Sequence, residues 1–303
     1  MHRAIKTSFL ITLCLVLTAV SSGADRRFEK KFSVSPGGTF RLSTDVGSVT
    51  LTGGSGNEVS VVADLWGSER DVNDFEITAD QTGSGVDVKG RNKHGHGWFG
   101  FGNNNVDVHY IISVPQEYNL DMSTSGGNVS ISTVKGSVRG GTSGGNIDIM
   151  KVEGPVDMRT SGGNVRAEQI SGKLNMETSG GEIHVAAVAG DVDVSTSGGN
   201  IALSDVDGKV RAETSGGDVH VRLKGANKGM YVETSGGNIE LAMAKNSNAS
   251  IDASTSGGDV TCDLPITMSG KISESRMKGT INGGGATVHA RTSGGDIRIV
   301  ALE

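Results

Sequence analysis

Aromatic residues are scarce in this chain of 303 residues, where Phe, Trp and Tyr together make up 4% of the sequence. A core built mainly on large rings is therefore excluded, and small and β-branched side chains must fill it.

Cysteine is almost absent too. Cys14 lies in an N-terminal segment that we expect to be removed, so Cys262 has no intramolecular disulfide partner. We expect Cys262 to behave as a small buried hydrophobic residue, because it occupies an apolar position of a repeat.

Motifs for catalysis are missing as well. The sequence has no Gly-x-Ser-x-Gly motif, no Walker loop and no zinc motif. Its regular part has no long loops to build the cleft of clustered acids that polysaccharide lyases and hydrolases need. The outward positions of one predicted strand mix charged and uncharged side chains: Ser130, Asp148, Arg166, His184, Ala202 and His220. We therefore predict that the protein is not an enzyme and has no catalytic residues, metal site or cofactor.

The apolar run at the N-terminus, Phe9 to Val20, is too short to span a bilayer. It follows the basic residues Arg3 and Lys6, and Ser22-Gly23-Ala24 after it offers small residues at the −3 and −1 positions of a cleavage site. This pattern predicts a signal peptide over residues 1–24, cleaved after about Ala24. The alternative is a retained single-pass anchor, which needs about 20 apolar residues. We expect an exported protein (periplasmic, at the cell surface or secreted) with no membrane span in the mature chain.

An excess of basic residues is also lacking. The formal net charge is −6, and removal of residues 1–24 takes away two basic residues and no acidic one, which makes it −8. An acidic exported protein is a poor partner for nucleic acid or for anionic lipid. We expect neither.

Glycine, by contrast, is abundant: 47 residues, about twice the usual share of roughly 7%. Much of it falls in the tetrapeptide Thr-Ser-Gly-Gly, whose first six copies begin 18 residues apart. Three further copies follow at wider spacing. The nine starting residues are Thr124, Thr142, Thr160, Thr178, Thr196, Thr214, Thr234, Thr255 and Thr292. A fixed period of this kind indicates stacked repeats, each of which buries its apolar side chains against its neighbours.

One repeat shows how the coil is built. Ile147 and Ile149 alternate with polar residues, and Val156 and Met158 do so again after a turn at Gly154. Two short strands and two glycine turns use all 18 residues. We predict an all-β, single-domain parallel β-solenoid (β-helix), narrow and two-sided, with 18-residue coils of two short strands each and irregular coils at both ends. Its parts are residues 25–118, an irregular N-terminal cap, and 119–303, the repeats with looser C-terminal coils.

The Thr-Ser-Gly-Gly turn has a structural explanation. We expect its two glycines to supply positive φ angles, and its threonine to face inward and bond backbone groups of the turn. The next residue, usually Asn, is expected to form a hydrogen-bonded ladder along the solenoid. Because the threonines face inward, an ice- or carbohydrate-binding threonine surface is not favoured. A calcium-binding edge is not favoured either, since its nonapeptide pattern is absent.

The segment 91–105 interrupts the pattern with a loop rich in Gly and Asn. It is a possible contact site, because exposed aromatic residues favour interfaces and loops often carry function. No acid or cysteine near it completes a metal ligand set with His109 at a recognisable spacing. The candidate contact residues are His94, His96, Trp98, Phe99 and Phe101.

Several motifs together resemble a known family. These are the Gly-Gly-Asn-Ile/Val repeats, Val114-Pro115 before them, and the endings Gly279-Thr280-Ile281-Asn282-Gly283-Gly284-Gly285 and Ser293-Gly294-Gly295-Asp296-Ile297. Over roughly residues 35–303 the chain is similar to the bacterial "putative adhesin" domain family of unknown function, which is akin to the Gly-Ile-Asn head domain of autotransporter adhesins. The resemblance implies a β-solenoid and an adhesin-like role, and it brings no catalytic residues.

These observations lead to one functional hypothesis. We expect a non-catalytic, exported adhesin-like or envelope scaffold protein whose rigid rod serves association with an envelope protein, a glycan or itself. The irregular ends, 25–118 and 264–303, are expected to be caps or contact sites, because the ends of a solenoid expose strand edges. The alternative is a polysaccharide-active β-helix enzyme or a glycan-binding module.

Overall fold

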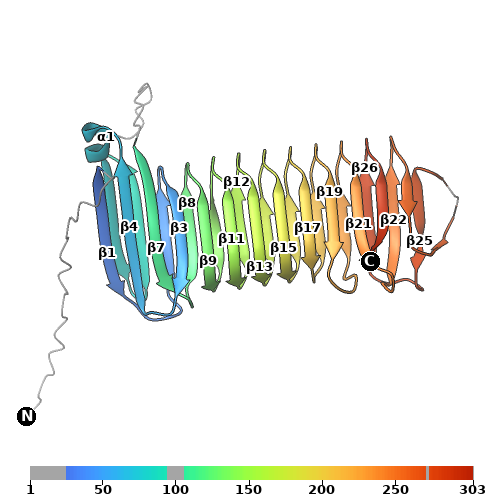
Figure 1. The fold of residues 1–303 in the computed structure, drawn as a ribbon, viewed down its shortest axis with the longest axis horizontal. Helices are drawn as coiled ribbons and strands as arrows, with labels where there is room; N and C mark the ends of the chain where they lie inside the picture. The colour runs from blue at the N-terminus through green and yellow to red at the C-terminus, as the bar shows by residue number, and fades with distance from the viewer. Residues whose placement is uncertain (1–24, 94–105, 271–272, 303) are drawn as a thin grey trace, which may run out of the picture.

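The computed structural model describes residues 25–93, 106–270 and 273–302, which form a narrow rod of two long β-sheets packed face to face (Figure 1). Most neighbouring strands are parallel and each turn of chain adds one strand to each sheet, so the prediction of a parallel β-solenoid is confirmed. In the described part of the chain, no helix is long and apolar enough to cross a membrane.

The first sheet has 13 strands among the described residues. In spatial order they are β1 (Arg26–Ser33), β4 (Glu58–Trp66), β7 (Asp107–Pro115), β3 (Ser48–Gly54), β9 (Val129–Lys135), β11 (Ile147–Glu153), β13 (Val165–Ser171), β15 (Ile183–Ala189), β17 (Ile201–Val206), β19 (Val219–Leu223), β21 (Ile239–Ala244), β27 (Ile297–Leu302) and β23 (Val260–Cys262).

The second sheet has 14 strands among the same residues. They are β24 (Ile266–Met268), β25 (Arg276–Ile281), β22 (Ala249–Thr255), β26 (Thr287–Thr292), β20 (Met230–Glu233), β18 (Val210–Glu213), β16 (Val192–Ser195), β14 (Leu174–Glu177), β12 (Val156–Thr160), β10 (Val138–Thr142), β8 (Asn119–Thr124), β2 (Thr39–Thr44), β6 (Gly85–Asn92) and β5 (Phe75–Thr82). A short helix that the sequence analysis does not anticipate, α1 (Glu69–Asp74), connects β4 to β5.

The core lies between the sheets and consists of apolar columns in 18-residue register. Val138 pairs with Val156, and Ile147 pairs with Val165, so equivalent side chains stack on one another along the rod. Ile149 and Met158 are fully buried. Burial of apolar surface contributes about 25 cal/mol per Å². Because each coil buries its apolar side chains against its neighbours, the stacking of coils, and not any single coil, stabilises the rod.

The strands of the first sheet contain a shift that the sequence analysis does not predict. Lys151 has φ of 56°, and equivalent left-handed residues recur in the neighbouring coils. This residue moves the alternation by one position, so that Ile149 and Val152 both face the core. The five residues of this column are Thr133, Lys151, Gln169, Ala187 and Asp205.

Antiparallel strands close the N-terminal end. β4 pairs antiparallel with β7 and β1 with β4 in the first sheet, while β5 pairs antiparallel with β6 in the second. Arg26 donates from Nη2 to the carbonyl oxygen of Phe75 (2.6 Å), and the ammonium group of Lys30 donates to that of Ala79. Charged side chains of one edge strand thus occupy carbonyl groups of the other, a known way to block edge-to-edge pairing.

At the C-terminal end the spatial order departs from the sequence order. β26 pairs with β20 on one side and β22 on the other, and β27 lies in the same way between β21 and β23. The coil of residues 287–302 is therefore inserted between two coils that precede it in the sequence. The antiparallel strands β25 and β24 then cover β22.

The expectation that both turn glycines supply positive φ angles is wrong. Of the glycines in the nine Thr-Ser-Gly-Gly turns, only Gly127 lies in the left-handed region, at φ of 110°. The second glycine is required for a different reason, the close approach of successive coils. A Cβ atom at Gly163 would lie 2.0 Å from the carbonyl oxygen of Gly145, whereas a Cβ at Gly162 would meet nothing nearer than 3.8 Å.

This difference provides a matched pair of variants. Gly163→Ala is expected to lower the free energy of unfolding by about 3 kcal/mol, because the new methyl group collides with backbone. Gly162→Ala should change it by no more than about 0.5 kcal/mol. Urea unfolding followed by circular dichroism measures both. Equal effects of the two substitutions would contradict this explanation of the second glycine.

A buried tyrosine of the N-terminal end predicts alkaline sensitivity. Tyr110 on β7 is 0% exposed, and its hydroxyl group lies 2.9 Å from Oγ1 of Thr44. Burial raises the pKa of Tyr110 from 10.0 to about 12. Above pH 10 the side chain ionises in the unfolded chain while it stays protonated in the folded one, so stability falls by about 2 to 3 kcal/mol towards pH 12. Denaturant unfolding between pH 9 and pH 12 should show that the free energy of unfolding falls less steeply with pH in Tyr110→Phe than in the wild type. Equal slopes in the two proteins would refute this.

Candidate functional site

The contact residues predicted from the sequence, His94, His96, Trp98, Phe99 and Phe101, lie outside the described residues. They remain a prediction. Contrary to the expectation of a buried side chain, Cys262 is only half-buried. It is free, packs against the core, and donates from Sγ to the carbonyl oxygen of Leu264 (3.5 Å). Burial raises the pKa of its thiol.

The nine turn threonines are buried, with exposed fractions from 1% to 9%. Thr160 is representative: its Oγ1 donates to the carbonyl oxygen of Gly145 in the preceding coil (2.8 Å) and accepts from the backbone N–H of Gly163 in its own turn (3.4 Å). Each hydroxyl group therefore connects two successive turns and satisfies backbone groups inside the rod. These threonines are structural residues whose hydroxyl groups bond to backbone, and five of them also contribute to the lining of the groove described below: Thr196, Thr214, Thr234, Thr255 and Thr292.

The residue after Gly-Gly forms the expected hydrogen-bonded ladder along the solenoid. Oδ1 of Asn146 accepts from the backbone N–H of Asn164 (2.8 Å), so each bond joins a side chain to the backbone of the next coil. The ladder is interrupted at Glu182. Its longer side chain accepts only from Nδ2 of Asn200 (3.4 Å) and does not reach the backbone N–H of that residue.

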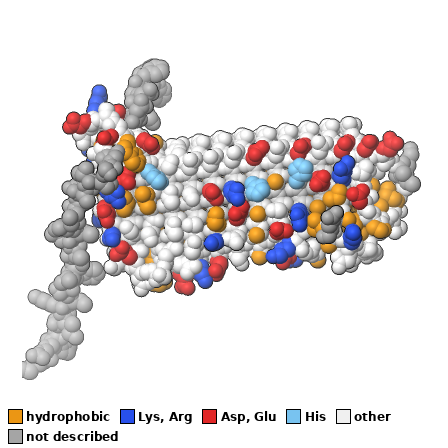
Figure 2. Space-filling model, in the orientation of Figure 1, with side chains coloured by type: hydrophobic (Ala, Val, Ile, Leu, Met, Phe, Trp, Pro, Cys, Tyr) orange, Lys and Arg blue, Asp and Glu red, His pale blue; other side chains and the backbone are white. Residues whose placement is uncertain are grey.

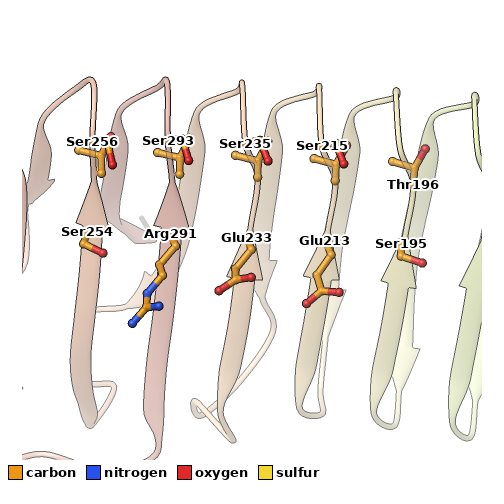
Figure 3. Close-up of a pocket in the computed structure, with 14 residues that line it drawn as sticks. Ser195, Thr196, Glu213, Ser215, Glu233, Ser235, Ser254, Ser256, Arg291 and Ser293 are labelled. Atoms are coloured by element: carbon orange, nitrogen blue, oxygen red, sulfur yellow. The ribbon is translucent and has the colours of Figure 1, made fainter.

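A groove runs along the outer surface of the Thr-Ser-Gly-Gly turns in the C-terminal third of the rod (Figure 3). It exists because the residues before and after each inward threonine both point outward. Its volume is about 680 Å³. One wall carries Ser195, Glu213, Glu233, Arg291 and Ser254, and the other carries Ser215, Ser235, Ser293 and Ser256. We call this the serine groove.

The charged groups of the serine groove differ in their partners. Glu213 accepts a hydrogen bond from the Arg211 guanidinium, and Oε1 of Glu233 lies 3.4 Å from Nε2 of His289. Arg291 makes no ion pair with any other described residue, although it lies next to Glu233 in the strand pairing. The groove thus offers two oriented carboxylates and one guanidinium with its donors unused.

A stack of three planar side chains supports the carboxylates. The Arg211 guanidinium lies 4.5 Å from the ring centroid of Tyr231, and the rings of Tyr231 and His289 are 4.9 Å apart at 11°. A hydrogen bond with Glu233 raises the pKa of Tyr231, with a smaller contribution from desolvation. Because both faces of the Tyr231 ring are covered, this residue cannot serve as a stacking platform for a sugar ring. It holds its neighbours in place instead.

The groove was not predicted from the sequence. Glu233 and Arg291 are 58 positions apart, and they become neighbours only because residues 287–302 insert between the coils of 230–244 and 249–262. The signal in the sequence is weak: the position before each inward threonine varies in charge from coil to coil. No alignment of columns in chain order would place Arg291 next to Glu233.

The arrangement is suited to binding a polar ligand. The serine groove is an open surface feature, and within the described part of the chain no three His, Cys, Asp or Glu side chains gather as a metal site would require. On the face shown in Figure 2, acidic and basic side chains are interspersed along the rod. Hydroxyl groups, carboxylates and a guanidinium in a row can exchange hydrogen bonds with a ligand rich in hydroxyl groups.

Comparison with known proteins gives one family match, by the model of the family Toastrack DUF4097 over residues 40–300. Among solved structures, a "putative adhesin" of Parabacteroides merdae ATCC 43184 is 12% identical, with 92% of this chain and 98% of that chain covered and a TM-score of 0.40. A "putative adhesin" of Bacteroides fragilis NCTC 9343 is 10% identical, with 91% of this chain and 98% of that chain covered and a TM-score of 0.38. A "putative cell adhesion protein" of Clostridium sporogenes ATCC 15579 is 15% identical, with 91% of this chain and 100% of that chain covered and a TM-score of 0.25. These likenesses are too low to support an argument about function, and the comparison with curated proteins gives no match.

The interruption of the ladder leads to a prediction. Glu182→Asn should give Asn200 the side-chain acceptor that its backbone N–H lacks and raise the free energy of unfolding by about 1 kcal/mol. Glu182→Gln removes the same charge but keeps the longer side chain, so it should have little effect. Urea unfolding of the three proteins measures the difference. A glutamine variant as stable as the asparagine variant would show that charge, and not reach, is the cause.

Proposed function

The chain belongs to the Toastrack DUF4097 family, and on that premise we propose that it is a non-catalytic, exported adhesin-like rod whose serine groove binds an extended glycan. Export is supported by the basic and apolar pattern of residues 1–24. The family match covers nearly the whole rod. The observation that carries the proposal is the alignment of Glu213, Glu233 and Arg291 opposite a column of serine hydroxyl groups.

The chemistry of the groove favours a glycan over a protein partner. Protein interfaces have a core of apolar and aromatic side chains. Among the described residues, Ile111 is the single large hydrophobic residue that is exposed, at 43%, and it lies on β7, away from the groove. Serine and carboxylate oxygens that repeat at the strand spacing of about 4.8 Å instead offer a row of hydrogen-bonding groups to the hydroxyl groups of a sugar chain.

Self-association through the ends of the rod has less support. The N-terminal strand edges are antiparallel, and Arg26 and Lys30 occupy carbonyl groups there. At the other end, the backbone N–H of Val260 on the last strand of the first sheet donates to Glu274 (2.7 Å), so that edge is partly covered as well. Both arrangements oppose end-to-end pairing of rods.

The position of the carboxylates also supports a role without turnover. Glycosidases use one carboxylic acid that protonates the leaving oxygen and a second that acts as base or nucleophile. An acid of the first kind is kept protonated by an enclosed apolar site. Glu213 and Glu233 are instead on an open surface, each beside a basic side chain.

Glycan arrays and affinity electrophoresis with purified residues 25–303 test the proposal. Arg291→Ala, and separately the pair Glu213→Gln and Glu233→Gln, should weaken binding about tenfold or more, because each removes a charge-assisted hydrogen bond. Arg159→Ala is the matched control, since Arg159 occupies the same column outside the groove and pairs with Glu177 (3.6 Å). It should leave binding unchanged.

Two results would overturn the proposal. One is a glycan that binds to both groove variants, Arg291→Ala and the double variant, as well as to the wild type. The other is release of new reducing ends from any bound polysaccharide, which would establish the enzyme alternative.

A further inference from the structure

The edge of the rod opposite the serine groove is regular except at the C-terminal third. Most coils turn there within a few residues around a glycine such as Gly154. The connections 224–229 and 245–248 are longer, and the segment 282–286, which leads into the inserted coil, meets them. Three segments far apart in the sequence therefore converge because residues 287–302 are inserted out of order.

These segments enclose a pocket of about 570 Å³, which we call the loop pocket. Volumes of this size are typical of sites for small molecules. Its polar lining residues are Lys224, Asn227, Asn246, Ser247 and Asn248, and alanines and glycines complete it. No acidic residue contributes to the lining, so the pocket lacks the ligands that calcium or a cationic molecule needs.

The walls of the loop pocket are fixed by side-chain bonds to backbone. Nδ2 of Asn227, which is 9% exposed, donates to the carbonyl oxygens of Ala286 (2.7 Å) and Asn248 (3.3 Å). Nδ2 of Asn282 donates to those of Lys245 (3.1 Å) and Ser247 (2.9 Å). Asn227 thus joins all three segments and Asn282 joins two of them, so the pocket is formed before any ligand arrives.

Polar groups at the pocket remain without partners. Ser247 is 4% exposed and its Oγ makes no hydrogen bond within the described structure. Unpaired buried hydroxyl groups are rare and destabilising. Rotation about χ1 can turn this hydroxyl group towards the pocket that the same residue lines. The side-chain amides of Asn246 and Asn248 are exposed and bond to no other described residue.

We propose that the loop pocket binds a single saccharide unit through its hydroxyl or acetamido groups. Primary amides and a serine hydroxyl group both donate and accept, as sugar hydroxyl groups do. Ala226, Ala244 and Ala286 supply apolar surface for the C–H groups of the sugar ring. The pocket lies on the edge opposite the serine groove and shares no residue with it, so this site stands whether or not the groove binds glycan.

The test uses purified residues 25–303 with N-acetylglucosamine, glucose and inorganic phosphate, by saturation-transfer difference NMR and titration calorimetry. A saccharide should bind to the wild type, and Asn246→Ala with Asn248→Ala should weaken it about tenfold or more. Arg159→Ala, which lies outside both the serine groove and the loop pocket, should leave it unchanged.

Ser247→Ala separates a binding role from a structural one. Removing the unpaired hydroxyl group should raise the melting temperature of the free protein by about 2 °C and weaken saccharide binding in the same variant. The proposal is overturned if neither sugar binds, if binding is unaffected by the asparagine and serine variants, or if phosphate alone binds.

Discussion

The structure depends on the short hydrogen bond from each turn threonine to the glycine carbonyl oxygen of the preceding coil, 2.8 Å long at Thr160. It holds successive turns so close that the second glycine has no room for a side chain. It also fixes the threonine inside, which forces the residues on either side of it outward. The serine groove is the external result of this internal bond, since its two walls are those outward columns.

The sequence predicts the coil well because one coil repeats many times. The period, the two strands and the inward threonines all follow from columns such as Ile147 and Val165. The left-handed residue at Lys151 does not, because lysine carries no preference for that conformation. Glycine composition alone does not reveal why a glycine is needed: Gly163 does not supply a positive φ angle, and its role is to leave space for the backbone of the preceding coil.

Spatial order is what the repeat cannot encode. The coils that begin their turns at Thr255 and Thr292 carry the same Thr-Ser-Gly-Gly-Asp signature, so nothing local says which stacks on Thr234. The structure shows that Thr292 bonds to Gly237 and Thr255 to Gly295. The neighbouring positions of Glu233 and Arg291, and the meeting of the three segments that form the loop pocket, both depend on this order. Neither site was therefore visible in the sequence.

The inserted coil has a consequence for how the protein is made. Translation delivers residues 249–262 before residues 287–302. Until the later residues are made, the strands β26 and β27 that separate β20 from β22 and β21 from β23 are missing. A polypeptide interrupted before residue 287 cannot assemble the native end of either sheet. Only a chain translated through the inserted coil can therefore attain the full order of strands.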